Sequence, residues 1–482
     1  MRIASSFPSS FAKSERPPMA PTPRCPVLPD EIMEDEIFAR LPAKSVLACR
    51  CLSRAWAAAL SSEDFTDWYH AIHGGRPKIF RLQDSSDGDE EEDDVPIAVT
   101  GACFPRLITV FWDDEDPLDR PTHPSLASTQ CRGLVILEHV PTGIHFLCNP
   151  STGQKRAIPE GRTTGCRLPL DVMQRYASLG LGYDARARRH KVVRVYYRGR
   201  DGEGRPASVG CEVYVVNDRD GSTESWRPIA ASPEGWVKQI KPSVFAQGHV
   251  YWSGHRTLGD RFEEIGTIII CFSVCEETFA TVPAPPGIQL VEVLRKWRFL
   301  TELAGRLCLF SGHEHQYDVW LLRGHGPGTV WDLHCRIEAG TASPAVNRVM
   351  RGRYDSYQNN MIPLALMDNG RSILLTQTDW PKDIWAYTPS SGDIEKLIDL
   401  ESLVHRNNWL LEVAVYEEST ARLGRQPRGD IVVLASSLST QAMSLVLRLL
   451  SERTLRRLMC VCRSWQNMIA SELWCSEYTH AR

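Results

Sequence analysis

The chain has 482 residues, of which 43% are hydrophobic, and a formal net charge of -4. This length and composition predict a soluble globular protein of two or three domains. The charge provides no broad basic field, so composition does not favour a partner that is nucleic acid or an anionic membrane. Apolar runs such as TIIICF at 267–272 are far shorter than the roughly 18 residues that a membrane-spanning helix needs.

Residues 1–26 are rich in Ser, Arg and Pro and lack the apolar core of a secretory signal. We expect a disordered tail here, with a transit peptide as the alternative. Fifteen cysteines are scattered without the spacing of a disulfide framework. Reduced thiols are therefore expected, and with them a location in the cytoplasm, the nucleus or both.

Residues 27–80 have a helical pattern, punctuated by the pairs Leu28-Pro29 and Leu41-Pro42. Four apolar residues, at i, i+3, i+6 and i+10 from Val46 to Trp56, form one face of a helix. A segment this short cannot bury such a face against itself. The pattern predicts a small helical domain that docks on a partner.

An acidic run follows, DSSDGDEEEDD at 84–94, with eight carboxylates in eleven positions. Like charges at this density repel one another and stay solvated, so we expect a flexible linker over 81–96. A site for a basic partner is the alternative.

Residues 97–430 carry short β-like runs separated by turn sequences. The stretch GIHFLCNPSTGQKRAIP at 143–159 is repeated in plan by DIWAYTPSSGDIEKLI at 383–398, with Gly153 matching Gly392. Turns about 50 to 70 residues apart suit blades of several strands, which predicts a β-propeller-like domain, with a β-sandwich as the alternative. Four tryptophans at strand positions are expected in the core between blades: Trp226, Trp252, Trp320 and Trp385.

The last segment, 437–482, returns to a helical pattern, so the predicted fold class is α+β with several domains. Its CVCRSW (460–465) resembles CLSRAW (51–56), and an offset of 409 places Cys51 on Cys460 and Trp56 on Trp465. The segment lacks the prolines of the first copy.

The N-terminal stretch LPDEIMEDEIFARLPAKSVLACRCLSRAW resembles the F-box, which opens with Leu-Pro, continues through Arg-Leu-Pro and Lys-Ser, and closes on a tryptophan. The resemblance implies docking on a Skp-type adaptor, which links to a cullin and a RING subunit. The adaptor-binding positions that it implies are Leu28, Pro29, Ile32, Leu41, Pro42, Val46, Leu52 and Trp56. Some of these side chains could instead pack inside the domain.

The C-terminal copy resembles a degenerate F-box. It presents a possible second adaptor-like face made of Leu450, Leu455, Leu458, Val461 and Trp465. Adaptor binding by this copy and helical packing against the propeller are the two interpretations that the sequence leaves open.

The middle of the chain resembles the F-box-associated domain of plant F-box proteins, through CRGLVILEH, LGYDARARRHKVVRVYY, GHVYWSGH and IICFSVCEETFATVP in that order. The two resemblances imply a non-catalytic substrate receptor of an SCF-type ubiquitin ligase, with a protein client whose identity the sequence does not give. A non-degradative adaptor-binding scaffold and a glycan- or small-ligand-binding propeller are the alternatives.

Other motifs offer little chemistry. GHEHQYD at 312–318 lacks further ligands at zinc-like spacing, so we expect no metal and no cofactor. No nucleophile, base and oxyanion set is apparent, and we expect no catalysis. Asp184 is expected to cap a turn. The basic run RARRHK at 186–191 is either a solvated hairpin edge or a contact for an acidic partner.

Overall fold

The structure is a computed structural model. It describes residues 38–51, 54–84, 107–112, 124–139, 143–161, 177–200, 206–216, 225–237, 242–258, 264–286, 297–313, 316–324, 329–338, 361–377, 383–399 and 413–423. All of them belong to one compact unit of the chain, Ile37–Ser437. The N-terminal tail, the acidic run beyond residue 84 and the C-terminal F-box-like segment lie outside the described residues.

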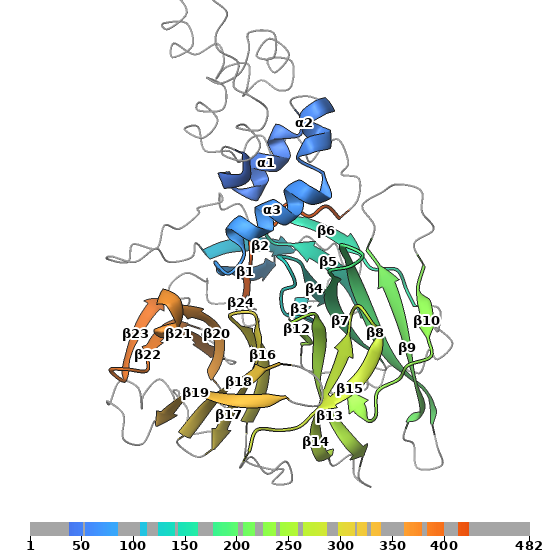
Figure 1. Cartoon of the computed structure of the whole chain (residues 1–482), viewed down its shortest axis with the longest axis vertical. Coiled ribbons are helices and arrows are strands. Elements are labelled where there is room, and N and C mark those ends of the chain that lie inside the picture. The colour runs from blue at the N-terminus through green and yellow to red at the C-terminus, as the bar shows by residue number, and fades with distance from the viewer. Residues whose placement is uncertain are drawn as a thin grey trace, which may run out of the picture. The chain divides into compact units, whose positions relative to one another are not determined.

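Four short helical elements come first (Figure 1). They are η2 (Phe38–Arg40), α1 (Ala43–Cys49), α2 (Arg54–Ala59) and α3 (Glu63–His73). The longest, α3, begins at Ser62, whose side chain accepts a hydrogen bond from the Phe65 N–H at 3.0 Å. This is the usual way in which serine satisfies a free N–H at a helix start. The helical prediction for this part of the chain is confirmed for the residues described.

Twenty-one of the strands described form five antiparallel blades, which together make a β-propeller. The first two are β3 (Pro124–Leu126), β4 (Val135–His139), β5 (Ile144–Asn149) and β6 (Gln154–Ala157), then β7 (Ala177–Asp184), β8 (Arg189–Arg200), β9 (Pro206–Val215) and β10 (Arg227–Ile229). The third is β11 (Trp236–Val237), β12 (Val244–Ala246), β13 (His249–Leu258), β14 (Glu264–Ser273) and β15 (Thr278–Val282). The last two are β16 (Trp297–Leu303), β17 (Arg306–His313), β18 (Gln316–Arg323) and β19 (Val330–Glu338), then β20 (Met361–Met367), β21 (Ser372–Gln377), β22 (Ile384–Thr388) and β23 (Asp393–Ile398). A 3-10 turn, η4 (Asp368–Gly370), joins β20 to β21. The predicted propeller is therefore confirmed, and the β-sandwich alternative is set aside.

A mixed three-stranded sheet closes the ring between the fifth blade and the first. It consists of β1 (Lys78–Asp84), which pairs in parallel with β2 (Leu107–Trp112) and antiparallel with β24 (Val413–Tyr416). On one side, Ile79 and Val413 pack with residues of the fifth blade. On the other, Phe80 and Tyr416 pack with residues of the first blade. Strands from both ends of the propeller's sequence thus complete it, and β1 takes in residues that the sequence pattern divides between the helical domain and the linker.

The two related hairpins have the predicted plan. In the first, β5 and β6 flank a turn in which the Gly153 N–H donates to the Asn149 carbonyl at 2.9 Å, with φ of +72° at the glycine. In the second, the Gly392 N–H donates to the Thr388 carbonyl at 2.9 Å, again with φ of +72°. Glycine adopts this left-handed conformation without steric cost, which explains why both sequences place it there.

The tryptophans occupy the contacts between neighbouring blades, as the sequence predicts. Trp226 is buried in the cluster shared by the first and second blades, and Trp252 in the cluster shared by the second and third. Trp320 and Trp385 are half-buried and pack against the clusters further round the ring. Each sheet is therefore held to the next by a side-chain core of its own.

Strand direction decides which turns share a face of the propeller. Strands alternate in direction within a blade, so the turns after the first and third strands lie at the same end. That end carries the turn at Arg132 and Gly133 in the first blade, the turn from Asp184 to Arg189 in the second, and the NPSTG turn. The helices lie over this end of the first two blades and over the closing sheet (Figure 1).

Candidate functional site

The residues with an implied adaptor role divide according to their exposure. Pro42 is exposed, and Leu41 beside it is half-buried. Trp56 is half-buried and packs edge-on against the Phe38 ring at 4.8 Å. Val46 is fully buried within the chain. Among the implied adaptor positions that the structure describes, Pro42 is thus the exposed one, while Leu41 and Trp56 are each half-buried.

The other implied positions fall outside the described residues. These are Leu28, Pro29, Ile32 and Leu52 of the first copy, and Leu450, Leu455, Leu458, Val461 and Trp465 of the second. Their roles stay predictions.

The backbone around the Leu41-Pro42 pair is held from within the helical domain. The buried Tyr69 hydroxyl, on α3, donates to the Leu41 carbonyl at 2.8 Å. The His73 ring stacks on Tyr69, with centroids 4.2 Å apart, and its Nε2 lies 2.9 Å from the Ala39 carbonyl. Burial raises the pKa of Tyr69, which therefore remains a hydrogen-bond donor at neutral pH. Helix α3 fixes the chain direction just before α1.

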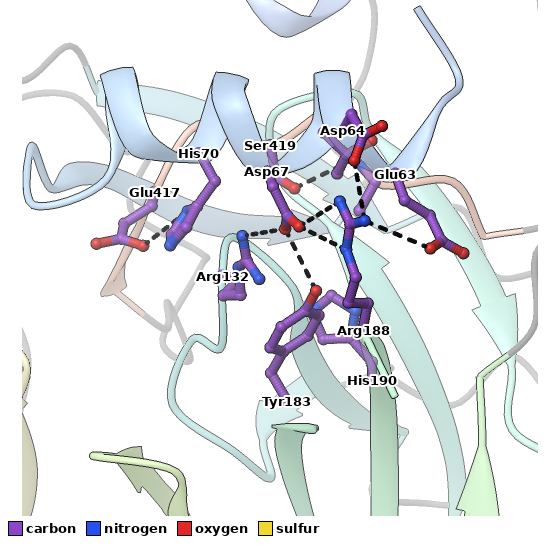
Figure 2. Close-up of polar contacts among 12 residues, drawn as sticks. Glu63, Asp64, Asp67, His70, Arg132, Tyr183, Arg188, His190, Glu417 and Ser419 are labelled. Atoms are coloured by element: carbon purple, nitrogen blue, oxygen red, sulfur yellow. Dashed lines mark hydrogen bonds and ion pairs between the residues drawn. The ribbon is translucent and has the colours of Figure 1, made fainter. Parts of the chain in front are cut away.

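An acidic face of α3, made of Glu63, Asp64 and Asp67, meets basic side chains from two propeller turns (Figure 2). Asp67 accepts hydrogen bonds from Arg132 at 2.7 Å and from Arg188 Nε at 2.8 Å. Burial acts to raise the Asp67 pKa, but the bonds from Arg188 and Arg132 outweigh it and lower that pKa. The carboxylate therefore stays ionised, and it ties α3 to the first two blades at once.

Further pairs extend this contact. Arg188 also bonds Asp64 at 2.9 Å, and Arg189 bonds Glu63 at 2.7 Å. The Tyr183 hydroxyl reaches Asp67 at 3.3 Å and carries the Arg132 guanidinium over its ring at 4.0 Å. The acidic partner of the basic run at 186–191 is therefore a helix of the same chain.

The segment Glu417–Thr420, which follows β24 and which we call the strap, contacts both the helices and the first blade. Glu417 accepts the Gly75 N–H at 2.8 Å, and its other oxygen lies 3.7 Å from His70 Nδ1. Glu418, which is buried, accepts the Ala43 N–H at 2.7 Å. The hydrogen bonds that Glu417 and Glu418 accept from Gly75 and Ala43 thus join the strap to the helical domain.

A half-buried carboxyl group lies close to the charge of Glu417 in the strap. Glu302, at the end of β16, accepts the Gly305 N–H. Burial raises its pKa to about 7, against the opposing effect of that hydrogen bond, and the charge of Glu417 adds to the rise. Glu302 therefore changes its charge close to neutral pH.

A second charged network joins the second and third blades at the same end. Lys191 Nζ lies 2.7 Å from Asp184, 2.9 Å from Glu277 and 3.0 Å from the Val274 carbonyl. Asp184 also accepts the Arg186 and Ala187 N–H groups at 2.9 and 3.0 Å, which confirms its predicted role in the turn. Burial acts to raise the Asp184 pKa, but the hydrogen bonds, that of Lys191 foremost, lower it to about 2.

The described residues offer little to the other functions considered. No group of three or more His, Cys, Asp and Glu among them could hold a metal ion, and none of their helices is long and apolar enough to cross a membrane. Part of the GHEHQYD motif, residues 314–315, falls outside them. The buried Trp226 and Trp252 are not free to stack on a sugar, whereas Trp320 and Trp385 are half-buried, so the glycan-binding alternative loses two of the four tryptophans that supported it.

Sequence reasoning missed the strap and Arg132. The strap has no motif, and its partners lie far away in the sequence: Glu418 bonds Ala43 across 375 positions. Two signals pointed to the α3 contact, namely three carboxylates at i, i+1 and i+4 from Glu63 and the basic run at 186–191. Nothing in the sequence says that these two patches meet.

Comparison with protein families agrees with both resemblances. The F-box domain profile matches residues 27–68 and, a second time, residues 436–475. The profile described as the F-box associated beta propeller domain matches residues 117–335. The family predicted from the N-terminal motif and from the middle of the chain is thereby confirmed, and the C-terminal copy is matched by the same F-box profile.

Several curated relatives come from Arabidopsis thaliana. An F-box/LRR-repeat protein, At2g43260, is 28% identical over 54% of this chain and 56% of its own length. F-box protein CPR1 is 27% identical over 63% of this chain and 71% of its own, and F-box protein DOR 26% over 60% and 68%. The chain thus spans little more than half of the first of these relatives. Solved structures are more distant: hydrazine synthase of Kuenenia stuttgartiensis aligns with a TM-score of 0.34 and 10% identity over 62% of this chain and 40% of that chain.

Proposed function

We propose that this chain, which carries an F-box domain and an F-box-associated β-propeller domain, is a substrate-recognition subunit of an SCF-type ubiquitin ligase. Its N-terminal F-box docks on a Skp-type adaptor, and through the adaptor on a cullin and a RING subunit. Its propeller recruits a protein client. The chain itself is a receptor without catalytic activity in this proposal.

The observation that carries the proposal is the Leu41-Pro42 pair, with an exposed proline and a half-buried leucine, within a matched F-box that packs on a propeller of the associated family. The neighbouring peptide groups are already hydrogen-bonded inside the chain, at the Leu41 carbonyl and the Ala43 N–H. A docking motif held in this way loses little conformational freedom on binding, which favours affinity. The free and mostly buried cysteines of the described residues support a reducing location in the cytoplasm or nucleus.

Capture on an immobilised Skp-type adaptor tests the docking mode. Replacing both Leu41 and Pro42 with alanine should lower capture at least about tenfold, as expected for apolar anchors of an interface. The matched control replaces Val330 and Leu333, which are exposed on the fourth blade, with alanine and should leave capture unchanged. Equal capture of the two variants would contradict this docking mode.

Client delivery needs a separate experiment. Quantitative comparison of ubiquitinated peptides in cells with and without the protein should reveal clients whose modification depends on Leu41 and Pro42. If adaptor capture is intact and no such client appears, the chain is the non-degradative scaffold instead.

A further inference from the structure

The strap is fixed first of all to the propeller. The Asn149 side chain donates to the carbonyls of Ser419 and Ala421, both at 3.0 Å, and the Ser419 N–H donates to Ser151 Oγ at 3.0 Å. Gly133 allows the close approach, because a Cβ at that position would lie 2.4 Å from the Glu417 carbonyl oxygen. The strap follows β24 directly, and the pairing of β24 with β1 brings the strap to the first blade.

The same strap holds both ends of α1. At the start, Glu418 accepts the Ala43 N–H and forms an ion pair with Lys78. At the end, the Thr420 carbonyl accepts a hydrogen bond from Arg50 Nη2 at 3.1 Å. Glu418 is buried, so water does not readily replace its partners. Loss of the Glu418 carboxylate leaves the Ala43 N–H unsatisfied, and loss of the Lys78 ammonium leaves the desolvated carboxylate without its cation.

The Leu41-Pro42 pair lies between two anchoring hydrogen bonds. Leu41 is fixed through its carbonyl by Tyr69, and the peptide after Pro42 is fixed through the Ala43 N–H by Glu418. One anchor comes from the helical domain and the other from the far end of the propeller's sequence. The conformation of the Leu41-Pro42 pair is therefore set jointly by the two domains.

We propose that Glu418 is a positioning residue for adaptor binding, and that it makes docking of the adaptor conditional on a closed propeller. With the ring closed, Glu418 holds the start of α1 and presents Leu41 and Pro42 in a preformed arrangement. With β24 unpaired, this anchor is withdrawn and the motif must be ordered at the moment of binding, which lowers the affinity. The inference rests on the proposed function, because it concerns the same adaptor.

Two measurements on the full-length chain test this, one without the adaptor and one with it. In hydrogen exchange of the free chain, Glu418→Ala should raise the exchange rate of the α1 amides, while those of the blades keep their protection. In titration with a purified Skp-type adaptor, the same variant should bind about tenfold more weakly, the change that one charge-assisted hydrogen bond can account for. Once the adaptor is bound, the α1 amides of Glu418→Ala and those of the unaltered chain should be equally protected from exchange.

Conservative and control variants separate positioning from general stability. Glu418→Gln keeps an oxygen that can accept the Ala43 N–H, so it should restore most of the affinity, to within about threefold of the original. Glu276→Ala, at an exposed carboxylate on a turn of the third blade, should change neither measurement.

The outcomes distinguish the two proposals. If the unaltered chain binds the adaptor and Glu418→Ala binds equally well, the positioning role is overturned and the proposed function stands. If the unaltered chain does not bind the adaptor at all, the proposed function is overturned, and this inference with it. Unchanged exchange of the α1 amides in Glu418→Ala would also overturn the positioning role.

Discussion

Replacing Lys191 with methionine should destabilise the contact between the second and third blades severely. Its ammonium and the Asp184 carboxylate are 9% and 7% exposed and lie 2.7 Å apart, and Glu277 lies at 2.9 Å. Asp184 and Glu277 keep their other hydrogen bonds but lose the ammonium that pairs with both, and removing one partner of a buried ion pair costs about 3–5 kcal/mol. Heat unfolding releases about 2.1 cal/mol/K per residue, or about 0.8 kcal/mol/K for the unit Ile37–Ser437. The melting temperature should therefore fall by about 4–6 °C.

Scanning calorimetry at pH 7 measures this effect, and the chain offers a matched control. Arg186 and Glu276 pair at 2.7 Å across the same two turns but are 76% and 56% exposed. Solvent screens such a pair, so Arg186→Met should lower the melting temperature by no more than about 1 °C. Equal losses for Lys191→Met and Arg186→Met would refute the argument that burial decides the strength of these pairs.

Acid titration gives the same network a second signature. Because the folded-state pKa of Asp184, about 2, lies below its ordinary 3.8, the stabilisation is fully present above pH 4 and is lost as the pH falls toward 2. At about 1.36 kcal/mol per pKa unit, the loss is about 2 kcal/mol. Lys191→Met should flatten this part of the stability curve, since Lys191 supplies the largest of the contacts that lower the Asp184 pKa.

Three further substitutions test the packing and the titration at this end of the propeller. The pKa of Glu302 is raised to about 7, so its protonated form stabilises the fold, and the free energy of unfolding should fall as the pH rises from about 4.5 to 7. Urea unfolding at several pH values should show this slope in the unaltered chain and its loss in Glu302→Gln. Gly180→Ala would bring a Cβ to 2.3 Å from the Trp252 ring, which should cost about 1–3 kcal/mol in the urea midpoint; an unchanged midpoint would disprove this packing. In Gly133→Ala, the new Cβ would be strained by the φ of +81° and would lie 2.4 Å from the Glu417 carbonyl oxygen. Limited proteolysis should therefore cut near the strap faster than in the unaltered chain, and equal rates would count against that close contact.

The sequence predicted those features that depend on interactions between residues close together in the chain. The paired hairpins around Gly153 and Gly392 followed from turn chemistry, and the interblade positions of Trp226 and Trp252 followed from their place in apolar strands. The helical domain followed from proline punctuation and the apolar face. Each of these features is decided within about twenty residues, which is the range over which sequence patterns carry information.

The junction could not be predicted in the same way. Asp67 and Arg132 meet across 65 positions, and Glu418 and Ala43 across 375, and nothing in their own neighbourhoods marks them as partners. The closing sheet was missed for the same reason, because β1 follows a helix and precedes an acidic run that suggest the end of one domain. Contacts of this kind depend on how many blades the ring holds, and a sequence pattern does not give that number.

Pairing of the first strand with the last also sets an order of events during synthesis on the ribosome. The chain from Asp84 to Tyr416 spans 332 positions, and at about 5–20 residues per second its synthesis takes about 17–66 s. Throughout that time β1 lacks its β24 partner, and its unpaired edge is a target for chaperones or for aggregation. The F-box is translated first, yet its contact with the strap can form only after nearly all of the propeller has been made. A chain that stops before Val413 lacks both the closing strand and Glu418.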